Sequence, residues 1–150
     1  MTNNLEGSAE KFLNLMDRLR QIGPQTAPPK EANISPSHLA YLTFSASHPG
    51  CGIQALAAGL KLSKPTVSIG VAQLEEADFF TRKPDPKDGR AIQLFLTPKG
   101  QKLHQRTYEF RCQKFEQLLK YLAPQERTTL NNLLEKAINI AENETQGETK

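Results

Sequence analysis

The chain has 150 residues and a formal net charge of +3, with 37% hydrophobic and 23% charged residues. This balance is typical of a globular protein with one sizeable core and excludes a disordered or fibrous chain. No apolar run is long enough to cross a bilayer, and residues 1–10 lack the pattern of a secretory signal. Two cysteines, Cys51 and Cys112, cannot make a disulfide framework, which favours a reducing cytoplasm.

The positive charge is concentrated in the middle of the chain. Residues 61–120 hold 12 basic and 7 acidic residues, a net charge of +5, whereas residues 1–60 are neutral and residues 121–150 carry −2. A phosphate-binding surface needs such a basic centre. An ordinary solvated face rich in lysine would give the same excess, and the charge alone favours this second explanation.

Helical periodicity dominates the first part of the chain. Residues 5–22 carry an apolar stripe at three- and four-residue spacing, which predicts a first helix. The stripe consists of Phe12, Leu15, Met16, Leu19 and Ile22. Gly23 and Pro24 end this helix, and a loop is expected as far as Asn33.

A second helix is expected to open at Pro36, because Ser35 is a good N-cap and proline suits the first helical position. It ends before His48–Gly50, and its inward residues are expected to be Leu39, Leu42 and Ala46.

Two short helices joined by a tight connection follow. The first spans about residues 54–60 and the second runs from the N-cap Ser63 to about Ala77. In the first helix, one side is expected to carry Ile53, Leu56 and Leu60. In the second, the expected buried face is Val67, Val71 and Leu74.

A β-hairpin comes next. Phe79–Lys83 and Arg90–Leu96 are the expected strands, and apolar residues alternate with period two in the second. Residues 84–89, PDPKDG, are turn formers and predict a polar tip.

Two longer helices complete the chain. Thr97 and Pro98 begin one that is expected to reach about Leu122, and another is expected from Pro124 to about Ala141. The last helix shows a heptad-like stripe of Leu130, Leu133, Leu134, Ala137, Ile138 and Ala141. Residues 143–150 are polar and are expected to fray.

This order of elements indicates a mainly α fold, a winged helix-turn-helix with a two-stranded wing, within one domain of residues 1–150. The winged helix covers about residues 36–97. Its second short helix suits the major groove of DNA, and the hairpin can reach the neighbouring backbone or minor groove. The flanking helices, about residues 5–22 and 98–142, carry apolar stripes that predict a homodimer, unless these helices pack on their own domain.

Residues 52–100 resemble the MarR family of bacterial transcriptional regulators. The likeness is clearest in LSKPTVS (62–68), LEEADF (74–79), DPKDGR (85–90) and LTPKG (96–100). The resemblance implies a homodimer that binds double-stranded DNA at a pseudo-palindromic operator. Many members repress transcription and release DNA when a small, often phenolic or lipophilic, molecule binds, and some sense oxidants through a cysteine.

The resemblance also implies that Arg90 enters the minor groove from the wing and that Asp88 orients its guanidinium. A narrow A/T groove concentrates negative potential, which attracts an inserted arginine. A plain surface ion pair is the alternative. Arg82, Lys83 and Lys87 lie on the same hairpin and are candidate phosphate contacts.

The second short helix supplies the remaining DNA-binding candidates. Its N-terminal end favours phosphate. The candidates there are Ser63, Lys64, Thr66 and Ser68. A helical wheel places Pro65, Ile69, Ala72, Gln73 and Glu76 on the outward face.

This sequence departs from the family on that helix. Family members commonly carry arginine at the positions of Ile69 and Gln73, so a guanine-reading side chain is missing here. Ile69 can pack on a thymine methyl and Gln73 can bind adenine, which predicts an A/T-leaning site. Gly70 replaces a usual leucine and costs up to about 1 kcal/mol of helix propensity. Weakened or lost specific DNA binding is the alternative.

Other features yield weaker hypotheses. His104, Tyr108 and Arg111 share a face of the long helix and are candidates for an effector pocket, although a solvated face explains them better. Cys51 and Cys112 are expected to be small buried hydrophobes rather than sensors. The histidines form no metal-ligand pattern with them, and no cofactor is expected. No nucleophile elbow, phosphate loop or paired-carboxylate site occurs, so an enzyme is not expected.

The leading hypothesis is therefore a dimeric DNA-binding regulator, a repressor tuned by a small molecule. The second hypothesis is a winged-helix module that binds another protein, because the outward face of the second short helix is not basic.

Overall fold

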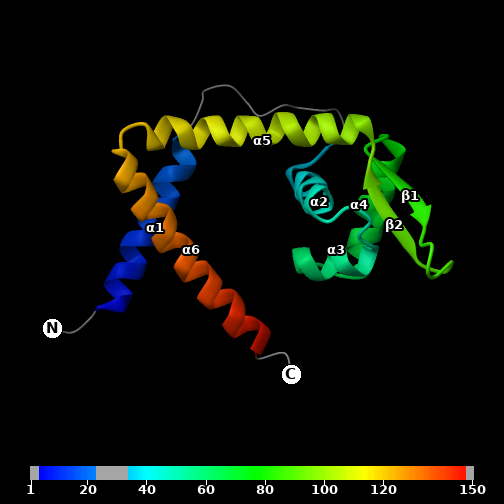
Figure 1. Ribbon diagram of the computed structural model, residues 1–150, viewed down its shortest axis with the longest axis horizontal. Helices are drawn as coiled ribbons and strands as arrows, with labels where there is room; N and C mark the ends of the chain where they lie inside the picture. Colours follow the sequence, from blue (N-terminus) through cyan, green and yellow to red (C-terminus); the bar gives the residue numbers. More distant parts are fainter. Residues whose placement is uncertain (1–3, 23–33, 148–150) are drawn as a thin grey trace. The chain divides into compact units, whose positions relative to one another are not determined.

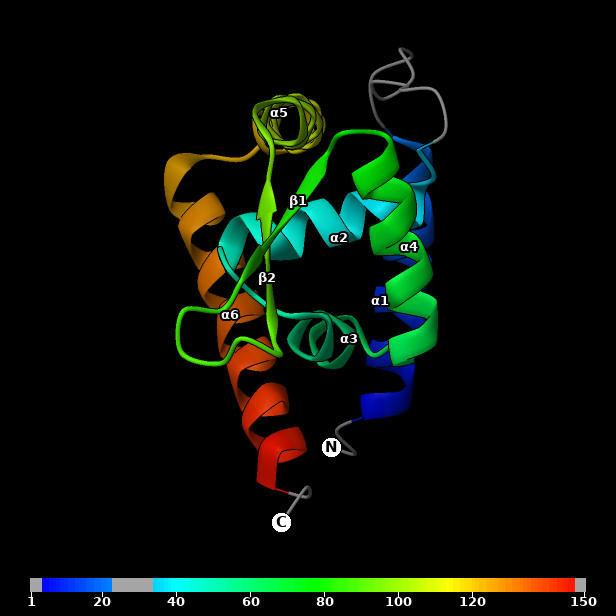
Figure 2. The same ribbon diagram turned by 90° about the vertical axis from the view of Figure 1, so that its right-hand side faces the viewer.

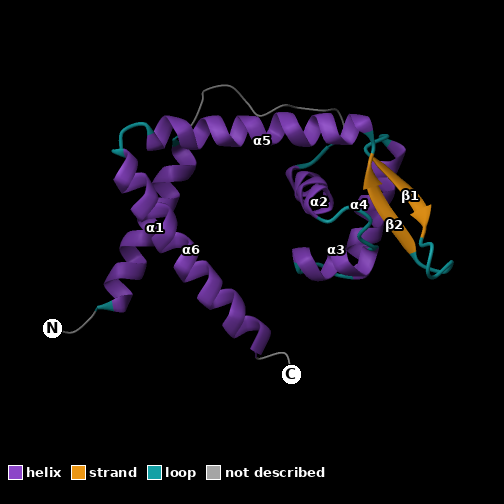
Figure 3. Ribbon diagram, viewed as in Figure 1, coloured by secondary structure: helices purple, strands orange, loops and turns teal. Residues whose placement is uncertain are grey.

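The structure is a computed structural model that describes residues 4–22 and 34–147. The expected loop that ends at Asn33 lies outside these residues. The chain divides into two compact units. One contains residues 25–112 and holds the winged helix with the first part of α5, and the other joins residues 1–24 to residues 113–150. Helices and strands are distinguished by colour in Figure 3.

Helix α2, Pro36–Ser47, begins where the serine–proline pair predicts. The Ser35 hydroxyl accepts a hydrogen bond from the His38 N–H, and His38 Nδ1 accepts one from the Ser35 N–H, both at 3.4 Å. This reciprocal capping box satisfies two donors that the helix would otherwise leave unpaired.

The helix-turn-helix consists of α3, Ile53–Leu60, and α4, Lys64–Glu76. Lys61 adopts a left-handed conformation with φ 55°, and the Leu62 N–H donates to the Ala57 carbonyl at 3.0 Å. Ser63 then caps α4. The connection is therefore short and tied at both ends, which fixes how α4 follows α3 (Figure 2).

The wing is an antiparallel hairpin of β1, Phe80–Pro84, and β2, Ile92–Leu96, in which Phe80 pairs with Leu96 and Pro84 with Ile92. The segment before α3 lies along β2: the Gly50 N–H donates to the Leu94 carbonyl, and the Leu94 N–H donates to the Cys51 carbonyl. Both backbone groups of Leu94 are thus satisfied outside the hairpin, which anchors the wing to the helical core.

One hydrophobic core holds the winged helix together. All the helices from α2 to α5 and both strands contribute buried side chains to it. Its fully buried members are Leu42, Leu56, Val67, Val71, Leu74, Phe79, Leu94 and Leu103. The predicted inward face of α4 is confirmed. In α2 the inward positions of Leu42 and Leu39 are confirmed, because Leu42 is buried and Leu39 packs against the core. Ala46 is only half-buried, and the other buried residues of α2 are Tyr41 and Ser45.

The other unit contains α1, Leu5–Gln21, the end of α5, Pro98–Leu119, and α6, Pro124–Gly147 (Figure 1). Helix α5 is shorter than predicted, because Arg127 Nε donates to the Leu119 and Leu122 carbonyls and closes the turn there. The expected fraying is wrong for residues 143–147, since α6 continues to Gly147, and residues 148–150 lie outside the described part of the chain. No helix-breaking residue occurs between Pro124 and Gly147, so nothing stops the helix earlier.

Among residues 4–22 and 34–147, no helix is both long enough and apolar enough to span a lipid bilayer.

Candidate nucleic-acid interface

The outward face of α4 is exposed, as the helical wheel predicts. Val67, Val71 and Leu74 turn into the core at 0–1% exposure, whereas Ile69 on the opposite side is 63% exposed. The remaining members of that face, Pro65, Ala72, Gln73 and Glu76, are also exposed. Helix α4 therefore presents one continuous accessible face, of the width that enters a major groove.

The N-terminus of α4 has fewer free hydrogen-bonding groups than the sequence suggests. The Ser63 hydroxyl accepts a hydrogen bond from the Thr66 N–H at 3.3 Å and lies 2.7 Å from the Thr66 hydroxyl. Pro65 has no N–H to offer. Of the first helical turn, this leaves the N–H of Lys64 and the exposed ammonium of its side chain for an incoming phosphate.

The tip of the wing is built by two aspartates. Asp85 Oδ1 accepts from the Lys87 N–H at 2.8 Å, and Asp88 Oδ1 accepts from the Arg90 N–H at 3.0 Å. The Asp88 carboxylate thus holds the backbone of Arg90, rather than the guanidinium that the family resemblance implies. These two turns shape the tip and leave the side chains of Lys87 and Arg90 exposed.

The other two cations of the hairpin are already engaged. Arg82 Nε forms an ion pair with Glu75 of α4, and the Lys83 ammonium lies 5.0 Å from the centre of the Phe95 ring. The ion pair joins α4 to the wing and holds these two elements against each other. The sequence did not reveal this pair, because its members are seven residues apart on different elements.

A family model supplies the identity of this arrangement. Residues 34–92 match the model described as the MarR family. Residues 34–92, which hold the helix-turn-helix and the first strand of the wing, are therefore a MarR-family domain.

Relatives agree with this assignment. The Bacillus subtilis (strain 168) protein YkoM, named an uncharacterized HTH-type transcriptional regulator, is 29% identical over 108 residues, which cover 72% of this chain and 70% of YkoM. Two solved structures share the fold. FabT of Streptococcus pneumoniae, solved in complex with DNA, has a TM-score of 0.66 at 18% identity and covers 94% of this chain and 95% of its own. PcaV of Streptomyces coelicolor, solved with its natural ligand, has a TM-score of 0.58 at 19% identity and covers 93% and 94%.

The glycine in the recognition helix of this MarR-family domain has a structural explanation. A β-carbon at Gly70 would overlap the ring of Tyr41, which is buried in the core at 3% exposure. The glycine therefore lets α4 approach the aromatic ring of α2. Its helix-propensity cost of up to about 1 kcal/mol is offset by this packing. Nothing in the local sequence connects residue 41 with residue 70.

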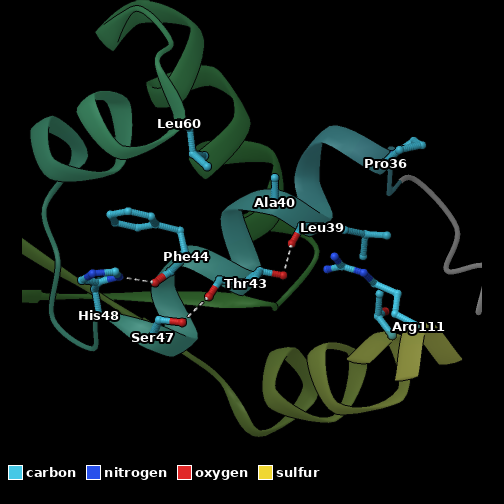
Figure 4. Close-up of a pocket in the computed structure, with 10 residues that line it drawn as sticks. Pro36, Leu39, Ala40, Thr43, Phe44, Ser47, His48, Leu60 and Arg111 are labelled. Atoms are coloured by element: carbon cyan, nitrogen blue, oxygen red, sulfur yellow. Dashed lines mark hydrogen bonds between the residues drawn. The ribbon is translucent and has the colours of Figure 1, made fainter. Parts of the chain in front are cut away.

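A pocket of about 510 Å³ lies in the same unit, between α2, the end of α3 and α5. Figure 4 shows the side chains of α2 that face it together with Leu60 and Arg111. The walls are largely apolar. The hydroxyls of Thr43 and Ser47 on α2 donate hydrogen bonds to carbonyls of their own helix, at 3.0 and 3.2 Å.

Two polar side chains of this pocket remain able to hydrogen-bond a molecule inside it. Thr107 is 8% exposed, and its hydroxyl has no hydrogen-bond partner. Arg111 lines the same pocket and is exposed. A buried hydroxyl without a hydrogen-bond partner lowers the stability of a fold by about 1–3 kcal/mol. The unpaired Thr107 hydroxyl therefore calls for an explanation.

Of the three predicted effector residues, only Arg111 lines this pocket. His104 lines a smaller hollow of about 290 Å³ near β2, and Tyr108 is 56% exposed. The helical spacing puts the three on one face of α5, but α2 covers only part of that face. A hydrogen bond with the Cys112 thiol raises the pKa of Tyr108 above its ordinary value.

The two cysteines are half-buried, less than expected. Cys51 Sγ lies 3.7 Å from the Ser45 hydroxyl, and Cys112 sits one helical turn from Tyr108. Within the described ranges no cluster of histidine, cysteine and carboxylate side chains has the geometry of a metal site.

Proposed function

We propose that this regulator represses transcription as a homodimer that binds a pseudo-palindromic operator in the cytoplasm and releases it when a small molecule binds. The observation that carries the proposal is the pairing of an exposed α4 face with a wing whose tip presents Lys87 and Arg90. Both elements belong to the same unit and are braced by the Glu75–Arg82 ion pair. A groove-reading helix beside a groove-reaching hairpin is the working geometry of a winged helix.

The homodimer is supported by the apolar stripes of α1 and α6. Helix α1 buries none of its residues, and Phe12 is 50% exposed. On α6, Leu133 is 62% and Ile138 is 53% exposed. Apolar stripes of this length are costly in water, and pairing with a second copy through a two-fold axis is the commonest way to cover them.

Each reading element has an expected role on DNA. Ile69 packs on thymine methyls and Gln73 binds adenine in the major groove, and Arg90 enters the adjacent minor groove. Phosphate contacts come from the wing through Lys87 and from the start of α4. Of the four residues predicted there, the expected contact is Lys64, because Ser63 and Thr66 hydrogen-bond each other.

Arg90→Ala is expected to weaken operator binding at low salt and to reduce the salt slope by about one unit. The reason is that each neutralised phosphate contributes about −0.9 to the slope of log K against log salt. Fluorescence anisotropy with a labelled duplex at four or more salt concentrations measures both quantities. Lys102→Ala, which removes an exposed lysine of α5, is the matched control and is expected to leave the slope unchanged. If Arg90→Ala bound the duplex with wild-type affinity, Arg90 at the wing tip would not contribute to DNA binding.

The small-molecule part of the proposal rests on the pocket lined by Thr107 and Arg111. An apolar cavity with one free guanidinium and one unsatisfied hydroxyl suits a small apolar molecule that carries a hydrogen-bond acceptor or an acidic group. The ligand-bound PcaV structure has the same fold, which is consistent with a ligand site in this chain.

Thr107→Val is expected to raise the free energy of unfolding by roughly 1 kcal/mol in the absence of ligand, because it removes an unsatisfied buried hydroxyl without changing the shape of the side chain. Thr43→Val is the matched control: its hydroxyl bonds the Leu39 carbonyl, so no gain is expected. Chemical denaturation of both variants measures the difference. A loss of stability in Thr107→Val would show that the hydroxyl has a partner.

The whole proposal is tested with duplex DNA taken from the region upstream of the protein's own gene. An inverted repeat there is expected to bind with a steep salt dependence, and a scrambled duplex at least about a thousandfold more weakly at physiological salt. Weak, salt-independent binding to every duplex would instead favour a winged-helix module that binds another protein. The absence of basic residues from the outward face of α4 suggests this alternative.

A further inference from the structure

Both helices of the helix-turn-helix rest on α2 through the same kind of contact, an aromatic ring against a glycine. A β-carbon at Gly59 of α3 would overlap the ring of Phe44, and one at Gly70 of α4 would overlap the ring of Tyr41. Neither glycine is at a positive φ, so backbone conformation does not explain them. Their shared property is the close approach of a helix backbone to a ring of α2.

Only one of these two rings can be reached from the pocket. Phe44 lines it and is half-buried, whereas Tyr41 is 3% exposed and lies in the core. The His48 ring stacks on Phe44 with the ring centres 4.2 Å apart and the planes at 15°. Figure 4 shows Phe44, near the end of α2, beside His48, the residue that follows this helix. Phe44 therefore has His48 stacked against its ring, the pocket beside it, and the bare backbone of α3 at Gly59.

We propose that Phe44 is the residue that transmits occupancy of this pocket to the helix-turn-helix, by pressing on α3 at Gly59. The inference deepens the proposed ligand response and rests on it. A pocket occupant competes with the Phe44 ring for space, and close-packed interiors pass on a displacement rather than absorb it. Glycine has no side chain that could give way, so the displacement reaches the backbone of α3.

The connection from α3 to α4 is suited to carry that displacement onward. Gly59 lies one residue before the end of α3, and residues 61–63 complete the turn. The Leu62 N–H bond to the Ala57 carbonyl and the Ser63 cap tie this turn to both helices. A shift at Gly59 therefore arrives at Lys64 and Thr66, the start of the recognition helix. A ligand alters DNA binding only if it favours one arrangement over the other, and this contact supplies the difference.

The test fills the pocket by tethering, so that no natural ligand has to be known. Cys51 and Cys112 are replaced by alanine, and Thr43→Cys introduces one thiol on the pocket wall. A benzyl or a methyl group is then attached to this thiol as a disulfide, and mass spectrometry confirms complete modification. The benzyl group occupies the pocket, and the methyl group is the matched control for the chemistry.

The benzyl adduct is expected to lower affinity for the duplex by about tenfold, within the 5–150-fold range that is usual for coupled sites, and the methyl adduct by less than about twofold. In a Phe44→Leu background the benzyl effect is expected to fall below about twofold, because leucine does not bridge the pocket and Gly59. Leu39→Val trims another pocket residue by one methylene group, and it is expected to keep the tenfold effect.

Amide hydrogen exchange provides a readout without DNA. The benzyl adduct is expected to change the exchange of residues 53–69 in the Phe44 background and not in the Phe44→Leu background. An unmodified protein that fails to bind DNA would contradict the proposed function, while hydrogen exchange would still decide the inference. Equal benzyl effects with phenylalanine and with leucine at position 44, or no effect on either readout, would overturn it.

Discussion

Leu133→Asp combined with Ile138→Asp is expected to convert the protein from a dimer into a monomer and to lower operator affinity by more than about a hundredfold. Both side chains are more than half exposed in the single chain and belong to the apolar stripe of α6. Burying two unpaired carboxylates in a dimer interface costs several kcal/mol, and each 1.4 kcal/mol is about a tenfold change in affinity. In the proposed homodimer each chain binds one half-site, so DNA binding is expected to be lost together with dimerisation.

Sedimentation equilibrium measures the oligomeric state, and anisotropy measures the binding. Asn132→Asp combined with Asn139→Asp adds the same two charges to the opposite face of α6, so this matched variant is expected to stay dimeric and to bind DNA. Circular dichroism establishes that both variants keep their helices. A double aspartate variant on the Leu133 face that remains a dimer would place the interface elsewhere.

Gly100→Ala is expected to lower the free energy of unfolding by about 1–3 kcal/mol, the usual cost of overpacking a core. A β-carbon at Gly100 would overlap the carbonyl oxygen of Phe79. That carbonyl cannot retreat easily, because it accepts a hydrogen bond from the Thr97 N–H at 3.0 Å. Thr97 in turn caps α5 through the Gly100 N–H. The substitution therefore strains the point where the wing returns to the start of α5.

Thermal and urea denaturation measure the loss. Gly89→Ala is the matched control, because a β-carbon at Gly89 would meet nothing within 4 Å, and its stability is expected to stay within about 0.5 kcal/mol of the wild type. Wild-type stability in Gly100→Ala would mean that α5 and Phe79 do not approach as closely as described.

Much of the fold could be predicted because its signals are local. As N-cap residues, Ser35 and Ser63 predict where α2 and α4 begin. The alternation of apolar residues with period two after residue 90 predicts the second strand of the wing. The outward face of α4 followed from its three buried positions alone. The end of α5 was placed too late, because Arg127 closes that turn from the next helix and has no signature within α5 itself.

The candidate site was less predictable, because its details depend on contacts between distant elements. Arg82 looked like a free cation until the structure paired it with Glu75. Gly70 looked like a defect in the recognition helix until Tyr41 was found against it. The pocket combines α2 with Thr107 and Arg111, and helical spacing on α5 alone could not show which of its residues α2 would cover.

The mass of the protein–DNA complex tests the central claim most directly. Sedimentation velocity of the wild-type chain with a short duplex that contains the upstream inverted repeat is expected to give one duplex bound by two chains, with no complex of one chain even at low protein concentration. A complex of one chain on one duplex, or two chains that bind a single half-site as well as the full repeat, would contradict a dimer that reads DNA with two winged helices.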